Sequence, residues 1–173
     1  MKHYRWLLIV LCLLLALTGC GARSLQGEAS RALELDLSAG TAVSERDTHG
    51  GFHGDGMSFL KLSFPDDALA DVIAADPAWN PLPLSNVTTA LVYGLRSEED
   101  GSDLGWGPYL TDEQGEPLVS PAVENGWYRF IDRHAQSYDS ADESEVLERG
   151  SFNFTLALYD ADRNELYYLT LDT

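Results

Sequence analysis

Hydrophobic and polar residues alternate over several short stretches of the chain, a pattern typical of strands that cover a core. The clearest alternation spans residues 152–158, and a cluster of turn-forming residues at 160–164 leads to a second apolar run over 166–171. Residues 57–64 alternate in the same way. We therefore predict a C-terminal hairpin and a separate strand over 57–64.

Further segments are rich in β-branched and aromatic residues or alternate over a shorter distance. We expect strands at 33–37, 41–48, 87–93 and 127–134. Only one helix is expected. It begins near Ser63, where a hydroxyl residue is followed by proline and acids, and it ends at Asp76, before Pro77.

These elements predict an α+β fold: a mainly antiparallel sheet of six to eight strands with one packed helix. The alternative is an all-β sandwich or barrel with one helix. There is no internal repeat and no long linker, so residues 31–173 are expected to form a single globular domain.

The N-terminus has a different pattern. Lys2 and Arg5 precede an apolar run of about a dozen residues, which ends in the sequence Leu-Thr-Gly-Cys at 17–20. This run is short for a membrane span, which needs roughly 20 apolar residues, but it has the length of a signal peptide.

The first 20 residues resemble the signal sequence and lipobox of bacterial lipoproteins. This resemblance implies that residues 1–19 are removed and that Cys20 carries the lipid. The small and polar residues 20–30 would then form the lipidated end and a flexible tether. The protein would lie at the extracytoplasmic face of a bacterial membrane, anchored by its lipid.

The amino-acid composition limits the kinds of site and partner that are possible for the chain after the expected signal peptide. Its two cysteines are Cys12, in the expected signal peptide, and Cys20, so no free thiol is left for a disulfide, a metal or a nucleophile. The chain has 28 acidic and 11 basic residues, for a net charge of −17. Such a charge argues against nucleic acid as a partner.

One short segment concentrates groups that could bind a ligand. Within residues 47–55 the candidates are two aspartates and two histidines: Asp47, His49, His53 and Asp55. Imidazole and carboxylate groups together suit zinc or a similar divalent ion. The same segment contains Gly50 and Gly51, so it could also be a simple hairpin turn.

The register of that hairpin decides between these interpretations. A two-residue turn places Thr48 opposite His53 and puts the two histidines on opposite faces. A three-residue loop instead places His49 opposite His53 and Asp47 opposite Asp55, with all four side chains on one face. We expect the two-residue turn, and therefore no tight metal site.

Other candidate sites carry less weight. The aspartates of 160–164 imitate the start of a calcium loop, but the glycine and glutamate that an EF-hand needs are missing. His134 is expected to be a surface histidine. Four aromatic residues could line a groove or pack in the core: Trp79, Trp106, Tyr109 and Trp127.

No motif of a known enzyme class occurs, and we assign no catalytic residue and no cofactor. Residues 31–173 resemble, in general style, the uncharacterised surface lipoproteins of Gram-positive bacteria. The sequence therefore predicts a non-enzymatic module that binds a surface protein or another ligand. The alternative is a divalent-metal-dependent hydrolase that uses the Asp47–Asp55 cluster.

Overall fold

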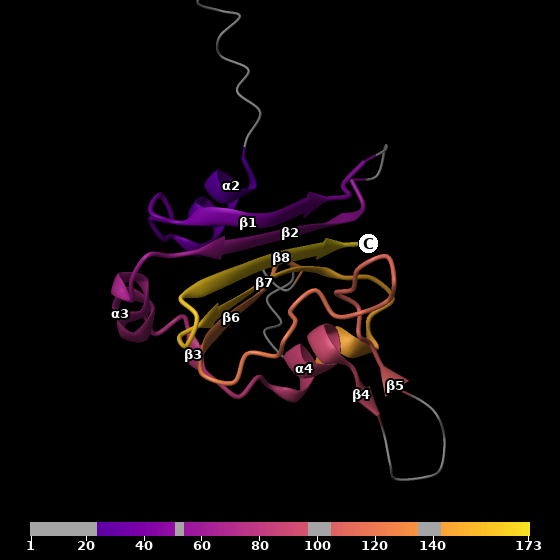
Figure 1. Cartoon of the computed structure of the whole chain (residues 1–173). Helices are drawn as coiled ribbons and strands as arrows, with labels where there is room; N and C mark the ends of the chain where they lie inside the picture. The colour runs from indigo at the N-terminus through magenta and orange to yellow at the C-terminus, as the bar shows by residue number, and fades with distance from the viewer. Residues whose placement is uncertain (1–23, 51–53, 97–104, 135–142) are drawn as a thin grey trace, which may run out of the picture.

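The computed structural model describes residues 24–50, 54–96, 105–134 and 143–173. Its centre is a six-stranded sheet in the order β1-β2-β8-β7-β6-β3, in which all neighbouring strands are antiparallel (Figure 1). The strands are β1 (Thr41–Asp47), β2 (Gly56–Ser63), β3 (Asn80–Pro81), β6 (Gly126–Asp132), β7 (Asn153–Asp160) and β8 (Glu165–Asp172). Two short strands, β4 (Leu95–Arg96) and β5 (Gly105–Trp106), form a separate pair.

The predicted fold class is confirmed: the structure is α+β, with an open and mainly antiparallel sheet. The barrel alternative does not hold, because β1 and β3 form two separate edges. The described residues contain three α-helices and one 3-10 helix rather than a single helix. They are α2 (Leu25–Leu33), α3 (Ala68–Ala75), α4 (Asn86–Tyr93) and η2 (Glu143–Glu148).

Layers cover both faces of the sheet, which explains why the central strand β7 is buried along nearly its whole length. Successive side chains of a strand point to opposite faces, so β7 contributes to two cores. Ala157 and Tyr159 belong to one core, whereas Phe154, Leu156 and Leu158 belong to the other.

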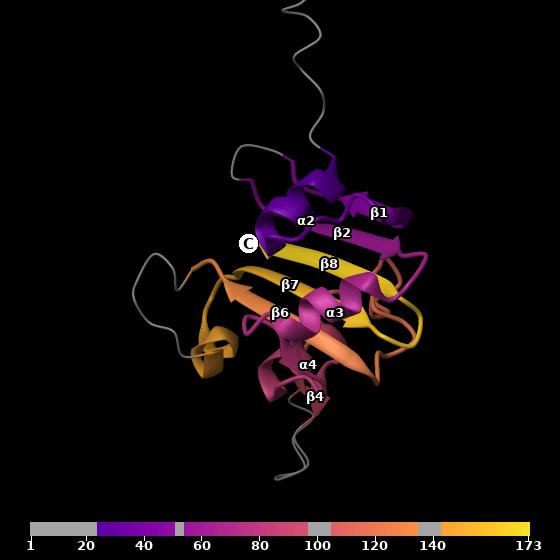
Figure 2. The same cartoon turned by 90° about the vertical axis from the view of Figure 1, so that its left-hand side faces the viewer.

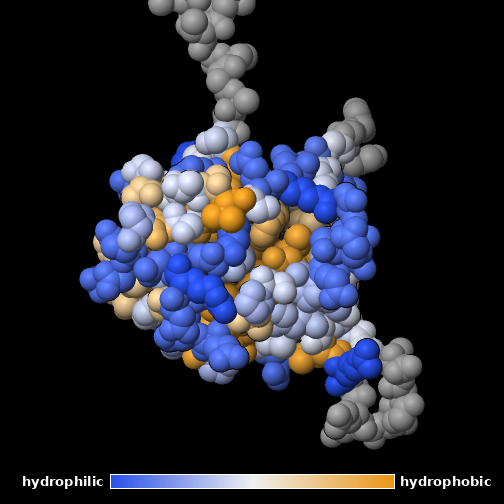
Figure 3. Space-filling model, viewed as in Figure 1, coloured by the Kyte–Doolittle hydropathy of each residue, from blue (hydrophilic) through white to orange (hydrophobic). Residues whose placement is uncertain are grey.

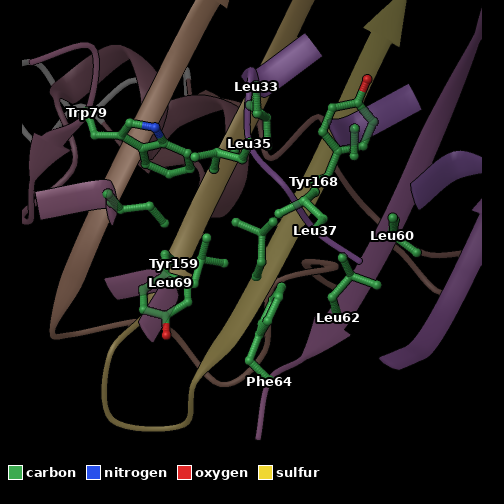
Figure 4. Packing of buried hydrophobic residues seen from close by; sticks show 14 residues of the cluster. Leu33, Leu35, Leu37, Leu60, Leu62, Phe64, Leu69, Trp79, Tyr159 and Tyr168 are labelled. Carbon is green, nitrogen blue, oxygen red and sulfur yellow. The ribbon is translucent and has the colours of Figure 1, made fainter. Parts of the chain in front are cut away.

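Helices α2 and α3 cover the first face, as Figure 2 shows. Leu33 of α2 and Leu69 of α3 pack among residues of β2, β7 and β8. Figure 4 shows Leu35 and Leu37, which follow α2, extending across the same core. The second face is covered by α4, η2 and the irregular segment around Leu110 and Val119.

Two expectations about residues 25–37 are wrong. Residues 33–37 are not a strand, because Leu33 ends the helix and 35–37 cross the core without joining the sheet. Residues 25–30, expected to belong to a flexible tether, are also helical. The Ser24 side chain accepts a hydrogen bond from the backbone of Gly27, and Ala29 is fully buried. The expected start of the folded part at residue 31 falls inside this helix.

Helix α4 corrects a third expectation, since residues 87–93 were predicted to be a strand. The Ser85 side chain accepts a hydrogen bond from the backbone of Thr88 and starts a helix there. Packing of Leu91 and Val92 against the sheet outweighs the β-preference of this segment. Helix α3 starts at Ala68, later than predicted, and ends before Asp76 as expected.

The C-terminal hairpin of β7 and β8 is confirmed, and so are the strands at 41–47 and 56–63. The expectations for residues 1–20, including the role of Cys20, lie outside the described residues. Among the helices that the structure describes, none is both long and apolar enough to cross a bilayer. Hydrophilic residues cover most of the face seen in Figure 3.

Candidate functional site

The register of the β1–β2 pair differs from both predicted hairpins. Asp47 lies opposite Ser58, and the backbone N–H of Thr48 donates to the carbonyl of Met57. Thr48 is therefore not opposite His53, and Asp47 is not opposite Asp55. The connection between the strands is longer than a two- or three-residue turn, because the ladder stops at Thr48 and Met57.

This longer connection brings only part of the predicted cluster together. The Nδ1 atom of His49 lies 2.7 Å from Oδ1 of Asp47, which also accepts the backbone N–H of His49 at 2.9 Å. Asp55 lies at the other end of the connection and lines a nearby pocket. His53 lies outside the described residues.

A residue from the far end of the chain completes the arrangement. The Nε2 atom of His49 lies 3.0 Å from Oδ2 of Asp172, in the last strand. The imidazole is thus held between two carboxylates. Ser58 contributes a third polar group, with its Oγ atom 3.2 Å from Nδ1 of His49.

Arg133, which follows β6, extends the network on the other side of Asp172. Its Nη2 atom lies 2.9 Å from Oδ1 of Asp172 and also donates to the carbonyl of Phe154 at 2.8 Å. The Asp172 carboxylate therefore contacts two basic groups, His49 and Arg133. The Nε atom of Arg133 is buried and has no hydrogen-bond partner among the described residues.

The two carboxylates set the protonation of His49. Partial burial acts to lower the pKa of His49, but hydrogen bonds and charge attraction from Asp47 and Asp172 outweigh it and raise the pKa above 6.5. The backbone hydrogen bond from His49 is the largest cause that lowers the pKa of Asp47. The arrangement therefore favours an imidazolium that donates from both nitrogens.

An imidazolium with two carboxylate partners is poorly suited to act as a general base or as a metal ligand. It has no free lone pair to accept a proton or to bind a metal ion. Ser58 is only 2% exposed, so its hydroxyl is not open to a substrate. Within the part of the chain that the structure describes, no group of three histidine, cysteine or acidic side chains is arranged so that it could hold a metal ion.

A pocket of about 310 Å³ adjoins this network at the end of the sheet where β7 begins and β8 ends. Its wall is formed almost entirely by polar atoms. The lining residues come from four segments of the chain: Gly54, Asp55, His134, Ser151, Phe152, Asn153, Asp172 and Thr173. Asp172 belongs to both the pocket and the His49 network.

The other sequence candidates are accounted for by packing or turns. Trp79 is buried and Trp127 packs against the same core, whereas Tyr109 packs against the core on the opposite face. These aromatic residues therefore share no groove, and Trp106 is 46% exposed on β5. The residues at 160–164 form the hairpin turn, in which buried Asp160 accepts backbone hydrogen bonds.

His134, predicted to lie on the surface, lines the pocket and is only partly exposed. Its backbone N–H lies close to the Asn153 carbonyl, 3.2 Å away, and to Oδ1 of Asp132, 3.0 Å away. The end of β6 is therefore tied to the start of β7, which positions one wall of the pocket.

Sequence reasoning missed Asp172 and Arg133. The strand sequences did contain a signal for the polar end of the sheet where Asp172 and Arg133 lie. On one face of the sheet, the apolar pattern changes to hydroxyl residues at Ser58, Thr155 and Thr170, which are buried neighbours on adjacent strands. That change marks where the core stops and the polar network begins.

The chain was compared with protein-family models, curated proteins and solved structures. No family model matches it. No curated protein and no solved structure matches it either.

Proposed function

We propose that this protein is a lipid-anchored binding module on the extracytoplasmic face of a bacterial membrane, and that it binds a small polar ligand in the pocket beside Asp172. The pocket is the observation that carries the binding role. It gathers hydroxyl, amide, imidazole and carboxylate groups from four chain segments. Convergent polar groups in a concave site are what a polar ligand needs for orientation.

The membrane anchor is supported by the sequence at residues 1–20 and by the position of α2. Helix α2 begins at Leu25, so only Gly21 to Ser24 separate it from Cys20. Four extended residues span at most about 14 Å. A lipid on Cys20 would hold the folded domain close to the bilayer, with little freedom to move away.

A binding role fits the site better than catalysis because both nitrogens of His49 face carboxylates. The chemical groups that line the pocket indicate the class of ligand that it binds. The Asp172 carboxylate is paired with His49 and Arg133, whereas Asp55 is exposed and supplies a second carboxylate. An ammonium group beside hydroxyl groups would complement Asp55 together with Asn153 and Ser151.

The anchor is tested by Cys20→Ala in the full-length chain, expressed in bacteria that lipidate lipoproteins. We expect the wild-type chain to partition into the detergent phase and to incorporate a fatty-acid label. The variant should lose the label. Equal labelling of both chains would show that Cys20 is not the lipidation site.

The pocket is tested with two sugars that differ in one group, glucosamine and glucose. We expect nuclear magnetic resonance titration of the full-length chain to show shifts at Asn153 and Thr173 with glucosamine, and weaker shifts with glucose. Asp55→Asn should remove this difference. Asp71→Asn, on the exposed face of α3, is the matched control. If neither sugar shifts the pocket residues, this ligand class is wrong.

A further inference from the structure

The two edges of the main sheet are built differently. The edge formed by β3 has only two residues, Asn80 and Pro81, and proline cannot donate a backbone hydrogen bond. The opposite edge, β1, has seven residues and contains neither lysine nor proline. Short strands, prolines and lysines are the usual protections of an edge against pairing. By this measure β3 is protected, whereas β1 has only its charged side chains and the irregularity between Ala42 and Ser44 to oppose pairing.

The side chains of β1 are also open to solvent on both faces. Every residue of the strand is exposed except Arg46, which is partly buried and pairs with Glu113. Val43, beside an irregularity between Ala42 and Ser44, is 57% exposed. Helix α2 lies beside β1 in Figures 1 and 2, but no residue of β1 belongs to either core.

The direction of the backbone groups follows from the ladder. The N–H of Thr48 points to β2, where it bonds the Met57 carbonyl. Because N–H and C=O groups alternate sides along a strand, Arg46 and Ser44 also pair with β2. The N–H and C=O groups of Glu45 and Asp47 therefore point outward, toward the open edge.

Charge indicates what kind of strand can pair there. Glu45 places a carboxylate beside the outward backbone groups, on a chain with a net charge of −17, whereas the carboxylate of Asp47 is already paired with His49. A second copy would bring two strongly negative bodies together, which electrostatic repulsion opposes. A strand with lysine or arginine residues would instead be attracted, and cross-strand pairs of opposite charge stabilise a sheet.

We propose that β1 binds an extended, basic segment of a partner protein by strand addition, which would extend the six-stranded sheet to seven strands. The outward backbone groups of Glu45 and Asp47 would supply the hydrogen bonds. The carboxylate of Glu45 and the negative charge of the chain would favour basic side chains. This surface is separate from the pocket beside Asp172 and does not require the lipid.

The test uses the full-length chain in detergent and two fluorescent ten-residue peptides. In one, lysine alternates with threonine or valine; in the other, glutamate replaces every lysine. We expect the lysine peptide to bind and to slow amide exchange at Glu45 and Asp47 by about tenfold or more. The glutamate peptide should not bind. Equal binding of both peptides, or of neither, would overturn the proposal.

Two substitutions at one position separate backbone pairing from charge. Glu45→Pro removes an outward N–H without removing a β1–β2 hydrogen bond, and should abolish binding of the lysine peptide. Glu45→Ala keeps the N–H and should weaken binding only by the loss of one charge. If Glu45→Pro binds as tightly as Glu45→Ala, strand addition is wrong. Amide exchange in β7 and β8 reports whether each variant is folded.

A third variant covers the case in which Glu45→Pro does not fold. Glu45→Lys keeps the backbone donor and reverses the charge, so the lysine peptide should bind less tightly and the glutamate peptide more tightly. Unchanged affinities would contradict the role of charge. Protection of β1 without peptide, together with a doubled mass in solution, would show that a second copy occupies the edge and would also overturn the proposal.

Discussion

The Nε2 atom of His49 lies 3.0 Å from Oδ2 of Asp172, although 123 positions separate these residues in the sequence. The contact ties the end of β1 to the last strand of the sheet. Since Asp47 approaches the other ring nitrogen, the strength of this tie depends on the protonation of one imidazole.

The first prediction concerns the pH dependence of this tie. The pKa of His49 is raised in the folded protein, so its stabilising contribution is fully present below the unfolded value of about 6.5. The contribution is lost as the pH rises through the higher, folded pKa. We expect the melting temperature of the wild type to exceed that of His49→Ala most clearly near pH 6, and the difference to shrink at alkaline pH.

Asp47, which contacts His49, sets the lower limit of this pH range. The pKa of Asp47 is lowered, so its contribution is present above its unfolded value of about 3.9 and is lost as the pH falls through the lower, folded pKa. His134→Ala is the matched control. A melting-temperature difference for His49→Ala that is independent of pH would contradict this prediction.

Local patterns were sufficient to predict the strands in which large apolar side chains recur at alternate positions. The hairpin of 153–160 and 165–172 and the strand at 56–63 are the clear examples. The pattern failed at 33–37, where alternate leucines cross a core instead of joining a ladder. It also failed at 87–93, where capping by Ser85 and burial favour a helix despite β-branched residues.

The site was less predictable because it depends on long-range pairing. The sequence indicated Asp47 and His49 but could not supply their partner, since Asp172 reaches His49 only through the β2–β8 pairing. The register predicted for the β1–β2 hairpin was also wrong. A Gly-Gly pair favours a tight turn, but the ladder ends at Thr48 and Met57, before such a turn can form.

The second prediction concerns the core on the α4 side of the sheet. Phe154 is 1% exposed and packs against Phe130, with ring centroids 5.5 Å apart. Phe154→Ala should lower the free energy of unfolding by about 3–5 kcal/mol, as measured by urea denaturation. Val43→Ala, at an exposed position, should change it by less than about 0.5 kcal/mol. Equal effects would show that this side chain is not part of the core.

The third prediction asks whether α2 belongs to the folded domain. Leu33 is fully buried, and its carbonyl accepts a hydrogen bond of 2.8 Å from Arg129. Leu33→Ala should cost about 2–5 kcal/mol of stability because it leaves a cavity between the helix and the sheet. Val72→Ala, on the exposed side of α3, is the control. A flexible tether at 25–33 would instead make Leu33→Ala as mild as the control.

The last prediction is that the full-length chain does not bind zinc with submicromolar affinity near pH 7. Zinc binds neutral imidazole, but both nitrogens of His49 face carboxylates that favour its protonated form. The Asp172 carboxylate is in turn paired with Arg133. Zinc would have to displace a proton and disrupt two ion pairs before it gained a ligand.

Calorimetric titration with zinc, repeated on His49→Ala and His53→Ala, provides the measurement. We expect no saturable heat in the submicromolar range for any of the three proteins. Tight binding by the wild type that is lost in both variants would mean that the two histidines share a metal ion, and it would favour the metal-dependent hydrolase over the binding module. Because zinc competes with protons, repeating the titration at pH 8 makes the test more stringent, since deprotonation of His49 would then assist the metal.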